Sequence, residues 1–246
     1  MTGRITLGMA AALSVAIGGL WIGAGTQGEA QPVGAAGLPG ARAEIRAAEF
    51  PSLQAALDAL PPEGGVVQLP AGEFRLDQPL ILRTGDVLLR GAGSATHIKN
   101  VNTQQAPALI LEHPEGATNR KTELWRIQLS NFRITGNPQS GHGIEARRIN
   151  ELFIHGVTVS EHGGDGIRLH FCYEDPRISD SLVTYNKQTG VHLIGCHDIV
   201  VSANQLEENG DALRCIDGFN LAMSGNNLDD HLGDGVVIEN TSVSYT

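Results

Sequence analysis

A short pattern repeats five times between residues 124 and 239 and constrains the fold more than any other feature of the chain. Each copy is a turn of small residues followed by a short strand-like segment. The anchors of the five copies lie 23, 24, 22 and 23 residues apart, and they are Gly143, Gly166, Gly190, Ala212 and Gly235. A period this steady predicts a solenoid, in which each unit buries its apolar face only against the next unit.

The spacing of apolar residues indicates the kind of solenoid. After each anchor they occupy every second position, as in Ile167 and Leu169, which is the period of a strand and not of a helix. A second strand precedes each turn, with apolar points at Phe132, Ile134, Val157, Val159, Leu182, Val201, Leu206 and Leu228. Polar residues between the strands, such as Asn186 and Asn209, predict corners with left-handed backbone. We therefore expect one coil of a parallel β-helix per repeat, with two or three strands in each coil.

One helix is expected before the repeats, over residues 50–60, where an apolar stripe lies between Pro51 and Pro61. It is followed by Gly-Gly-Val-Val-Gln-Leu-Pro-Ala-Gly-Glu-Phe at 64–74 and by Leu-Arg-Gly-Ala-Gly at 89–93. This succession resembles the start of the pectate-lyase-like right-handed β-helix superfamily, over about residues 48–240. The resemblance implies an all-β, right-handed parallel β-helix whose N-terminal end is capped by the helix. The superfamily includes lyases, hydrolases, epimerases and phage tailspikes, so the resemblance implies no single activity.

The two ends of the chain carry separate predictions. Residues 1–30 have the pattern of an export signal, because Arg4 precedes an uncharged run and small residues at 28–30 could form a cleavage site. The alternative is an uncleaved membrane anchor, since the run is near the length that spans a bilayer. Residues 31–43 predict a linker and residues 44–246 the β-helix domain. We expect a secreted, periplasmic or cell-surface protein. Little sequence follows the fifth strand, which predicts either a fragment of a longer β-helix or a homo-oligomer that covers the last coil.

Composition limits the classes of binding partner and the number of disulfides that are expected. The formal net charge of −10 argues against nucleic acid. Three cysteines are too few for a disulfide scaffold. Cys172, Cys196 and Cys215 each follow an inward strand, so we expect a buried stack of thiols. One disulfide is the alternative, because neighbouring coils lie about 4.8 Å apart.

Basic residues gather at outward positions of the repeat strands, despite the acidic composition. These residues are Arg147, Arg168, His170, His192 and Arg214. Like charges on adjacent rungs repel each other. The strip therefore predicts either a bound polyanion or neutralisation by turn carboxylates such as Asp165 and Asp211. We assign Arg147, Arg168, His192 and Arg214 to the binding of an acidic, uronate-containing polysaccharide.

Lyase or epimerase chemistry on a uronate requires a group that neutralises the carboxylate and a base that removes the adjacent proton. The candidate catalytic residues are Arg168, His170, Tyr173, Asp175, Arg177, His192 and Arg214. Asp175-Pro176 is similar to the Asp-Pro-His run of mannuronan epimerases, with Arg177 in place of the histidine. A non-catalytic glycan-binding protein or a cell-surface structural protein is the alternative.

Two further motifs bear on hydrolysis and on metal binding. Gly141-His142-Gly143 and Asp229-Asp230 resemble elements of polygalacturonases. They should lie about four coils, or nearly 20 Å, apart, which is too far to act on one glycosidic bond. A hydrolase is therefore less expected, and His142 is interpreted as a turn residue. Asp211, Asp230 and Asp234 are candidate Ca²⁺ ligands, and the alternative is a protein without a cofactor.

Overall fold

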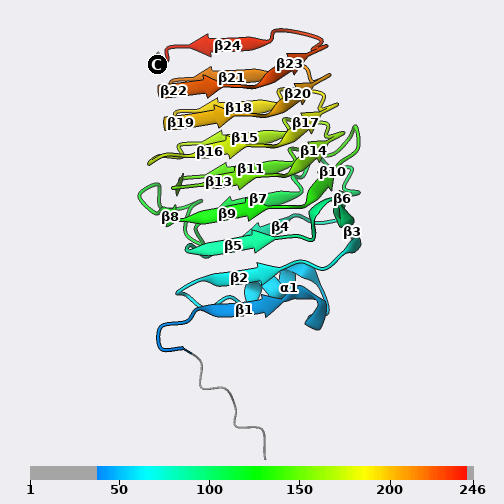
Figure 1. Cartoon of the computed structure of the whole chain (residues 1–246), viewed down its shortest axis with the longest axis vertical. Helices are drawn as coiled ribbons and strands as arrows, with labels where there is room; N and C mark the ends of the chain where they lie inside the picture. The colour runs from blue at the N-terminus through cyan, green and yellow to red at the C-terminus, as the bar shows by residue number, and fades with distance from the viewer. Residues whose placement is uncertain (1–37, 243–246) are drawn as a thin grey trace, which may run out of the picture. The chain divides into compact units, whose positions relative to one another are not determined.

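The structure is a computed structural model that describes residues 38–242, and it shows a parallel β-helix (Figure 1). Residues 40–242 belong to one compact unit. Three long sheets of eight, seven and seven strands run along this solenoid, and every strand pairs in parallel with its equivalent on the next coil. The expected export signal at 1–30 and residues 31–37 of the expected linker lie outside the described residues. Among the described residues, no helix has the length and apolar character needed to cross a bilayer.

We name the long sheets A, B and C. Sheet A consists of β1 (Ala43–Arg46), β2 (Gly65–Gln68), β5 (Val87–Arg90), β9 (Ile127–Ser130), β13 (Phe153–His155), β16 (Arg177–Ser179), β19 (His197–Ser202) and β22 (Phe219–Ser224). Sheet B consists of β3 (Gly72–Leu76), β6 (Thr96–Asn100), β10 (Arg133–Thr135), β14 (Thr158–Ser160), β17 (Leu182–Thr184), β20 (Gln205–Glu207) and β23 (Asn227–Asp229). Sheet C consists of β4 (Leu80–Leu82), β7 (Leu109–Glu112), β11 (Ile144–Arg147), β15 (Ile167–His170), β18 (Val191–Ile194), β21 (Leu213–Ile216) and β24 (Val236–Glu239). The remaining elements are the pair β8 (Leu124–Trp125) and β12 (Ile149–Asn150), the short 3-10 helices η1 (Ala47–Glu49) and η2 (Gly93–Ala95), and α1 (Leu53–Asp58).

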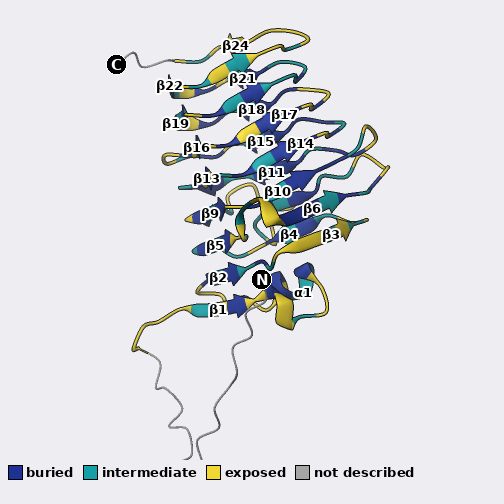
Figure 2. Ribbon diagram, turned by 45° about the vertical axis from the view of Figure 1, so that its right-hand side comes forward, coloured by how far each residue is buried: buried dark blue, intermediate teal, exposed yellow. Residues whose placement is uncertain are grey.

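The first inward residues of the sheet C strands form one column, as the repeat predicts. Their register runs from Ile144 through Ile167, Val191 and Leu213 to Val236. The first four are fully buried, whereas Val236 is 39% exposed because no described strand follows β24 in sheet C. Figure 2 shows the same trend, with dark blue inner positions in the middle coils and exposed positions in β24.

Two of the predicted apolar points of the second strand were wrong. In β17 the residue that packs inward is Val183, which is fully buried, whereas Leu182 is 36% exposed. The two are neighbours, so the period of two places them on opposite faces. Val201 is buried, but in β19 of sheet A, where it pairs with Ile178. Each coil therefore has three strands, and the prediction had assigned apolar residues of sheets A and B to a single strand.

The corners also differ from the prediction. Left-handed backbone occurs at Tyr185 and Glu208, one residue before the asparagines that were expected to adopt it. Asn186 and Asn209 are instead buried, and the Asn209 side-chain oxygen accepts from both the backbone and the side-chain nitrogen of Asn186, at 3.1 and 2.9 Å. Buried backbone groups require hydrogen-bond partners. The residues before the asparagines therefore make the bend, and the asparagines hydrogen-bond one coil to the next.

The N-terminal helix is present but shorter than residues 50–60. Ser52 is its N-cap, because its hydroxyl accepts from the Ala55 backbone nitrogen at 3.1 Å. Gln54 then pairs with β4, the first strand of sheet C. Its side chain accepts from the Ile81 backbone nitrogen at 2.8 Å and donates to the Ile81 carbonyl at 3.0 Å. The helix therefore satisfies backbone groups at the open edge of sheet C, which is the capping role that the sequence predicts.

The three cysteines are buried and free, as the thiol stack predicts. They lie one per coil. Cys172 and Cys196 follow β15 and β18 as predicted, but the expected position of Cys215 was wrong, because it lies within β21 and pairs with Leu193.

Candidate functional site

The outer face of sheet C brings the predicted basic residues together. Arg168 lies beside His192, and His192 beside Arg214, on three consecutive rungs. The neighbouring outward positions align Arg147 with His170. The strip of basic residues expected from the repeat is therefore confirmed as a spatial arrangement.

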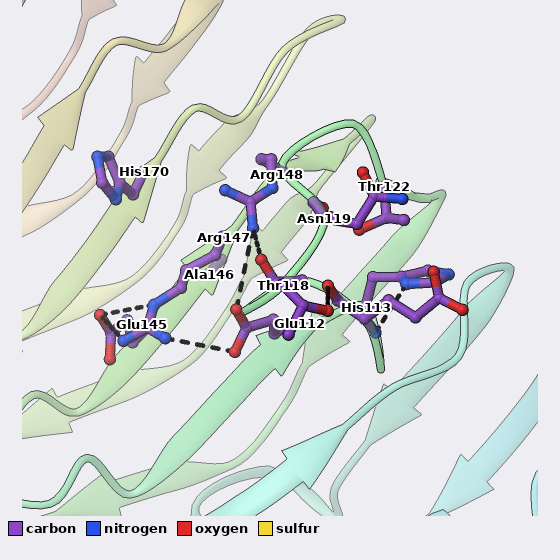
Figure 3. Close-up of polar contacts among 12 residues, drawn as sticks. Glu112, His113, Thr118, Asn119, Thr122, Glu145, Ala146, Arg147, Arg148 and His170 are labelled. Atoms are coloured by element: carbon purple, nitrogen blue, oxygen red, sulfur yellow. Dashed lines mark hydrogen bonds and ion pairs between the residues drawn. The ribbon is translucent and has the colours of Figure 1, made fainter.

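An open cleft of about 880 Å³ lies over the N-terminal part of this face. We call it the arginine cleft. It is bordered by β7, β11, β15 and the loop at 113–123, and its lining residues are Glu112, Gly116, Ala117, Arg120, Glu123, Glu145, Arg147, Arg148, Arg168, His170, Phe171 and Tyr173. Figure 3 shows Glu112 in contact with Arg147 and Arg148, and His170 apart from them on the neighbouring strand. Arginines from two coils and one loop thus line a single cavity.

Carboxylates neutralise part of this charge. Arg147 lies between Glu145, at 2.8 Å, and Glu112, at 3.3 Å (Figure 3). Although burial opposes its charge, the hydrogen bonds from Arg147 to these carboxylates hold its pKa above the ordinary value. Arg148 donates to the Gly116 carbonyl, which ties the 113–123 loop to β11. Among the described residues, Arg168 has one carboxylate contact, with Asp165 at 3.5 Å, and Arg148 has one, with Glu112 at 4.0 Å.

His170 and Tyr173 supply groups that can exchange protons in the same cleft. Burial lowers the pKa of His170, and the neighbouring Arg168, Arg147 and Arg148 lower it further. The imidazole is therefore neutral at pH 7 and able to accept a proton. Within the described residues its ring has no hydrogen-bond partner and stacks on Phe171, with centroids 4.3 Å apart. Burial raises the pKa of Tyr173, so its phenol is a proton donor at neutral pH.

A second polar centre surrounds the buried carboxylate of Asp165. One oxygen accepts from His192 Nδ1 at 3.0 Å and the other from the Thr189 backbone nitrogen at 3.0 Å. Burial opposes ionisation of Asp165, but the His192 hydrogen bond and the neighbouring imidazoles hold its pKa below the ordinary value. His142 approaches the same carboxylate from the preceding coil, 3.5 Å from Nδ1 to the nearer oxygen. Sequence reasoning missed this centre, because it weighed His142 only against the distant pair Asp229-Asp230.

The neighbouring cavity holds the C-terminal part of the predicted strip. It has a volume of about 480 Å³ and is lined by residues that include Asp165, Lys187, His192, Asp211 and Arg214. Arg214 is paired with Asp211 at 3.0 Å and with Glu239 at 3.2 Å. The turn carboxylates therefore do relieve the basic ladder, as the alternative interpretation allowed, although Asp165 is buried and not a surface residue.

Two predicted catalytic residues lie away from the arginine cleft. Asp175 is exposed, in a corner where Glu174 and Asp175 both have left-handed backbone. Arg177 follows that corner in β16 of sheet A, with its guanidinium 5.4 Å from the ring centre of Phe153. Neither lines the arginine cleft. The corner turns the chain onto another face, so of Tyr173 and Arg177, either of which was expected within reach of the basic strip, it is Tyr173 that lines the cleft.

The predicted Ca²⁺ ligands do not form a site in the described part of the chain. Asp211 uses one oxygen to accept from the Asp234 backbone nitrogen at 2.8 Å and the other for Arg214. No group of three or more His, Cys, Asp or Glu side chains among residues 38–242 is placed to hold a metal ion. The described residues therefore give the calcium prediction no support, and no chemistry is assigned to the ion.

Residues 117–246 match the family described as right-handed beta helix region. This match covers more than half of the chain, which therefore belongs to the right-handed β-helix family. Comparison of the sequence with curated proteins gave no match.

Among solved structures, the fold is similar to ORF18 of Geobacillus virus E2, with a TM-score of 0.58 and 17% identity over 80% of this chain and 48% of that one. It is also similar to the A-module of the mannuronan C-5 epimerase AlgE6 from Azotobacter vinelandii, with a TM-score of 0.57 and 22% identity over 78% of this chain and 58% of that one. The catalytic domain of a GH87 α-1,3-glucanase gives a TM-score of 0.54 and 13% identity over 84% of this chain and 40% of that one. The chain thus spans about half the length of these structures, and the likeness at this identity concerns the fold alone.

Proposed function

We propose that the protein is a carbohydrate-active β-helix protein that acts on an acidic, uronate-containing polysaccharide by lyase or epimerase chemistry in the arginine cleft. One observation supports this most strongly. Arg120, Arg147, Arg148 and Arg168 line one cavity with His170 and Tyr173, on a chain whose net charge is −10. Two of the fold neighbours, an epimerase of mannuronan and a glucanase, act on polysaccharides by name. The proposed setting is outside the cytoplasm, in line with the export signal expected at 1–30.

Arg168 is the proposed carboxylate-binding residue. Its long contact with Asp165 leaves guanidinium donors for a ligand, and its side chain is 30% exposed. Arg147 is held in place by Glu112 and Glu145, so it contributes positive potential more than free donors. Neutralising a uronate carboxylate stabilises the negative charge that develops when the adjacent proton leaves.

His170 is the proposed base and Tyr173 the proposed acid. In a lyase reaction His170 takes the proton from C5, the C4–O bond breaks, and a C4–C5 double bond forms. The oxygen that leaves then takes a proton from Tyr173. In an epimerase reaction the C5 carbanion instead regains a proton from Tyr173, and no bond between sugars breaks. Both routes begin with the same proton transfer to His170.

The proposed roles imply a particular pH dependence. The pKa of His170 is lowered by burial and by arginines, so the fraction of free base falls only when the pH drops below that lowered value. Activity should therefore be flat around neutral pH and decline on the acid side of 6.5, the ordinary value for histidine. A decline centred above 6.5 would contradict the assignment of His170 as the base.

The binding step is tested with two matched arginine variants. Arg168→Ala removes a donor from the cleft, whereas Arg177→Ala removes an exposed arginine from sheet A. We expect Arg168→Ala to weaken binding of hexagalacturonate or hexamannuronate by about tenfold or more at low salt, because hydrogen bonds to charged groups contribute about 1.5–3 kcal/mol. The loss should shrink at high salt, and Arg177→Ala should bind like the wild type. Equal binding by all three proteins would refute the carboxylate site.

A non-catalytic glycan-binding or structural protein is the second candidate. It is favoured by the pairing of Arg147 and Arg214 with carboxylates of the same chain. Uronate binding that depends on Arg168, without any loss of the C5 proton, would select this candidate.

A further inference from the structure

His142 is the site residue whose proton position the structure determines. Its Nδ1 accepts a hydrogen bond from the Asp165 backbone nitrogen at 2.9 Å. A backbone N–H can only donate, so Nδ1 must be the unprotonated nitrogen. Burial lowers the pKa of His142, more than the nearby Asp165 and Glu145 raise it, so the ring is neutral at pH 7. A neutral ring with a free Nδ1 carries its proton on Nε2.

The Nε2–H group meets a second donor and not an acceptor. It lies 3.4 Å from Nη1 of Arg168, which also can only donate. The carboxylate of Asp165 is already used by His192 and by the Thr189 backbone. Two donors therefore converge on one region and share no acceptor among the described residues. An oxygen atom of a ligand between them would accept from both.

The surroundings of His142 indicate what kind of oxygen this would be. His142 lines a cavity of about 340 Å³ on the side away from the arginine cleft, and its other lining residues are Thr103, Gln105, Pro138, Gln139, Ser140, Gly141, Gly163, Gly164 and Gln188. None of these carries a charge. The side-chain amides of the three glutamines have no partner within residues 38–242. Arg168 lines the arginine cleft and not this cavity. Such a wall suits hydroxyl groups and not a carboxylate.

We propose that this cavity is a second sugar subsite, in which His142 Nε2–H and Arg168 donate to an uncharged oxygen of a sugar unit. This inference rests on the proposed function in one respect, namely that the arginine cleft holds the carboxylate of one sugar unit. The cavity lined by His142 and the glutamines then holds the next unit through its hydroxyl groups. Arg168 connects the two, because it lines the arginine cleft and its Nη1 lies 3.4 Å from Nε2 of His142, which lines the other cavity. The Asp165 backbone N–H is the positioning group that keeps His142 in the donor form.

His142→Asn separates the two functions of this side chain. The asparagine oxygen can replace Nδ1 as acceptor for the Asp165 backbone N–H, while the Nε2–H donor is lost. The matched control is His113→Asn, because His113 Nδ1 also accepts from a backbone nitrogen, that of Glu115 at 3.1 Å, but lines neither cavity. Thermal melts of both variants report whether the fold is retained.

Binding of hexagalacturonate, hexamannuronate and the neutral maltohexaose is measured by calorimetry at low and high salt. We expect His142→Asn to bind its best hexasaccharide about three- to tenfold more weakly, as for a neutral hydrogen bond. The loss should be the same at both salt concentrations, unlike that of Arg168→Ala, and absent in His113→Asn. Nitrogen NMR of the free protein should place the His142 proton on Nε2.

Each other result has a definite meaning. Unchanged binding by His142→Asn, a loss that disappears at high salt, or a proton on Nδ1 would overturn the subsite while leaving the arginine cleft intact. Binding of maltohexaose alone, weakened by His142→Asn, would support the subsite and refute the acidic substrate. If no hexasaccharide binds to the wild type, both proposals are wrong.

Discussion

Acid should destabilise this fold mainly through His162, which lies fully buried between β14 and β15. Burial, together with the neighbouring His142, lowers its pKa from 6.5 to about 3. Within residues 38–242 its ring has one weak contact with a side chain, 3.4 Å from Nδ1 to the Ser140 hydroxyl, and the Ile134 backbone offsets the lowering of the pKa only in part. The folded protein therefore keeps this ring neutral at a pH where the unfolded chain would protonate it.

The sign and size of the effect follow from proton linkage. Between pH 6.5 and 3 the unfolded state binds one more proton at this residue, so stability falls as the pH falls through that window. One pKa unit corresponds to about 1.36 kcal/mol. At pH 5 the cost is therefore about 2 kcal/mol, and it approaches about 5 kcal/mol near pH 3. Small domains are stable by only about 5–15 kcal/mol, so this single group is significant.

The assay compares the urea midpoint at pH 7.5 and at pH 5 in the wild type and in His162→Phe. The variant should lose about 2 kcal/mol less than the wild type over this interval, whatever its stability at pH 7.5. His155→Gln is the control, because the His155 side chain is 48% exposed; it should lose as much as the wild type. The reasoning is refuted if wild type and His162→Phe lose the same stability.

Two further predictions concern the corner asparagines and β24, the last described strand of sheet C. Asn209→Ala should lower the free energy of unfolding by about 2–4 kcal/mol, because it removes the partners of buried groups of Asn186 and of the Val183 carbonyl. The control is Asn227→Ala at an exposed position, which should lower it by less than about 0.5 kcal/mol in the same urea unfolding. The apolar edge at β24, where Ile238 is 43% exposed, should promote self-association. Sedimentation should show oligomers for the wild type and fewer for Ile238→Glu. A wild type that stays monomeric at high concentration would contradict this prediction.

The fold could be predicted because its causes are local and repeated. Apolar residues at every second position, renewed after each anchor, leave little choice but stacked coils with a common register. The pattern was less able to separate sheets A and B, because Val201 of sheet A and Leu206 of sheet B were assigned to the same strand. It also did not give the direction of every side chain. Leu182 and Val183 are adjacent apolar residues, and only packing decides which one turns inward. Likewise, the asparagines were recognised as corner residues, but their bonds to the next coil depend on side-chain direction.

The site could be predicted only where it lies on the repeat. Arg147, Arg168, His170, His192 and Arg214 were found because strand register carries them onto one face. Glu112 and Arg120 come from β7 and a non-repetitive loop, so no period indicates them. Arg177 lies away from the cleft because two left-handed residues turn the chain onto sheet A. His142 was set aside because its real partner, Asp165, lies on the adjacent coil and not at the distant aspartate pair.

The central claim is that His170 removes the C5 proton of a uronate, and proton NMR of pectate and alginate in D₂O tests it directly. Both a lyase and an epimerase would remove the H5 signal, the first with formation of an unsaturated product and the second with deuterium in its place. We predict loss of H5 from one polymer with the wild type and with Arg177→Ala, and no loss with His170→Gln even when the polymer is bound. An H5 signal that persists in both polymers, or that disappears equally fast with His170→Gln, would contradict the account.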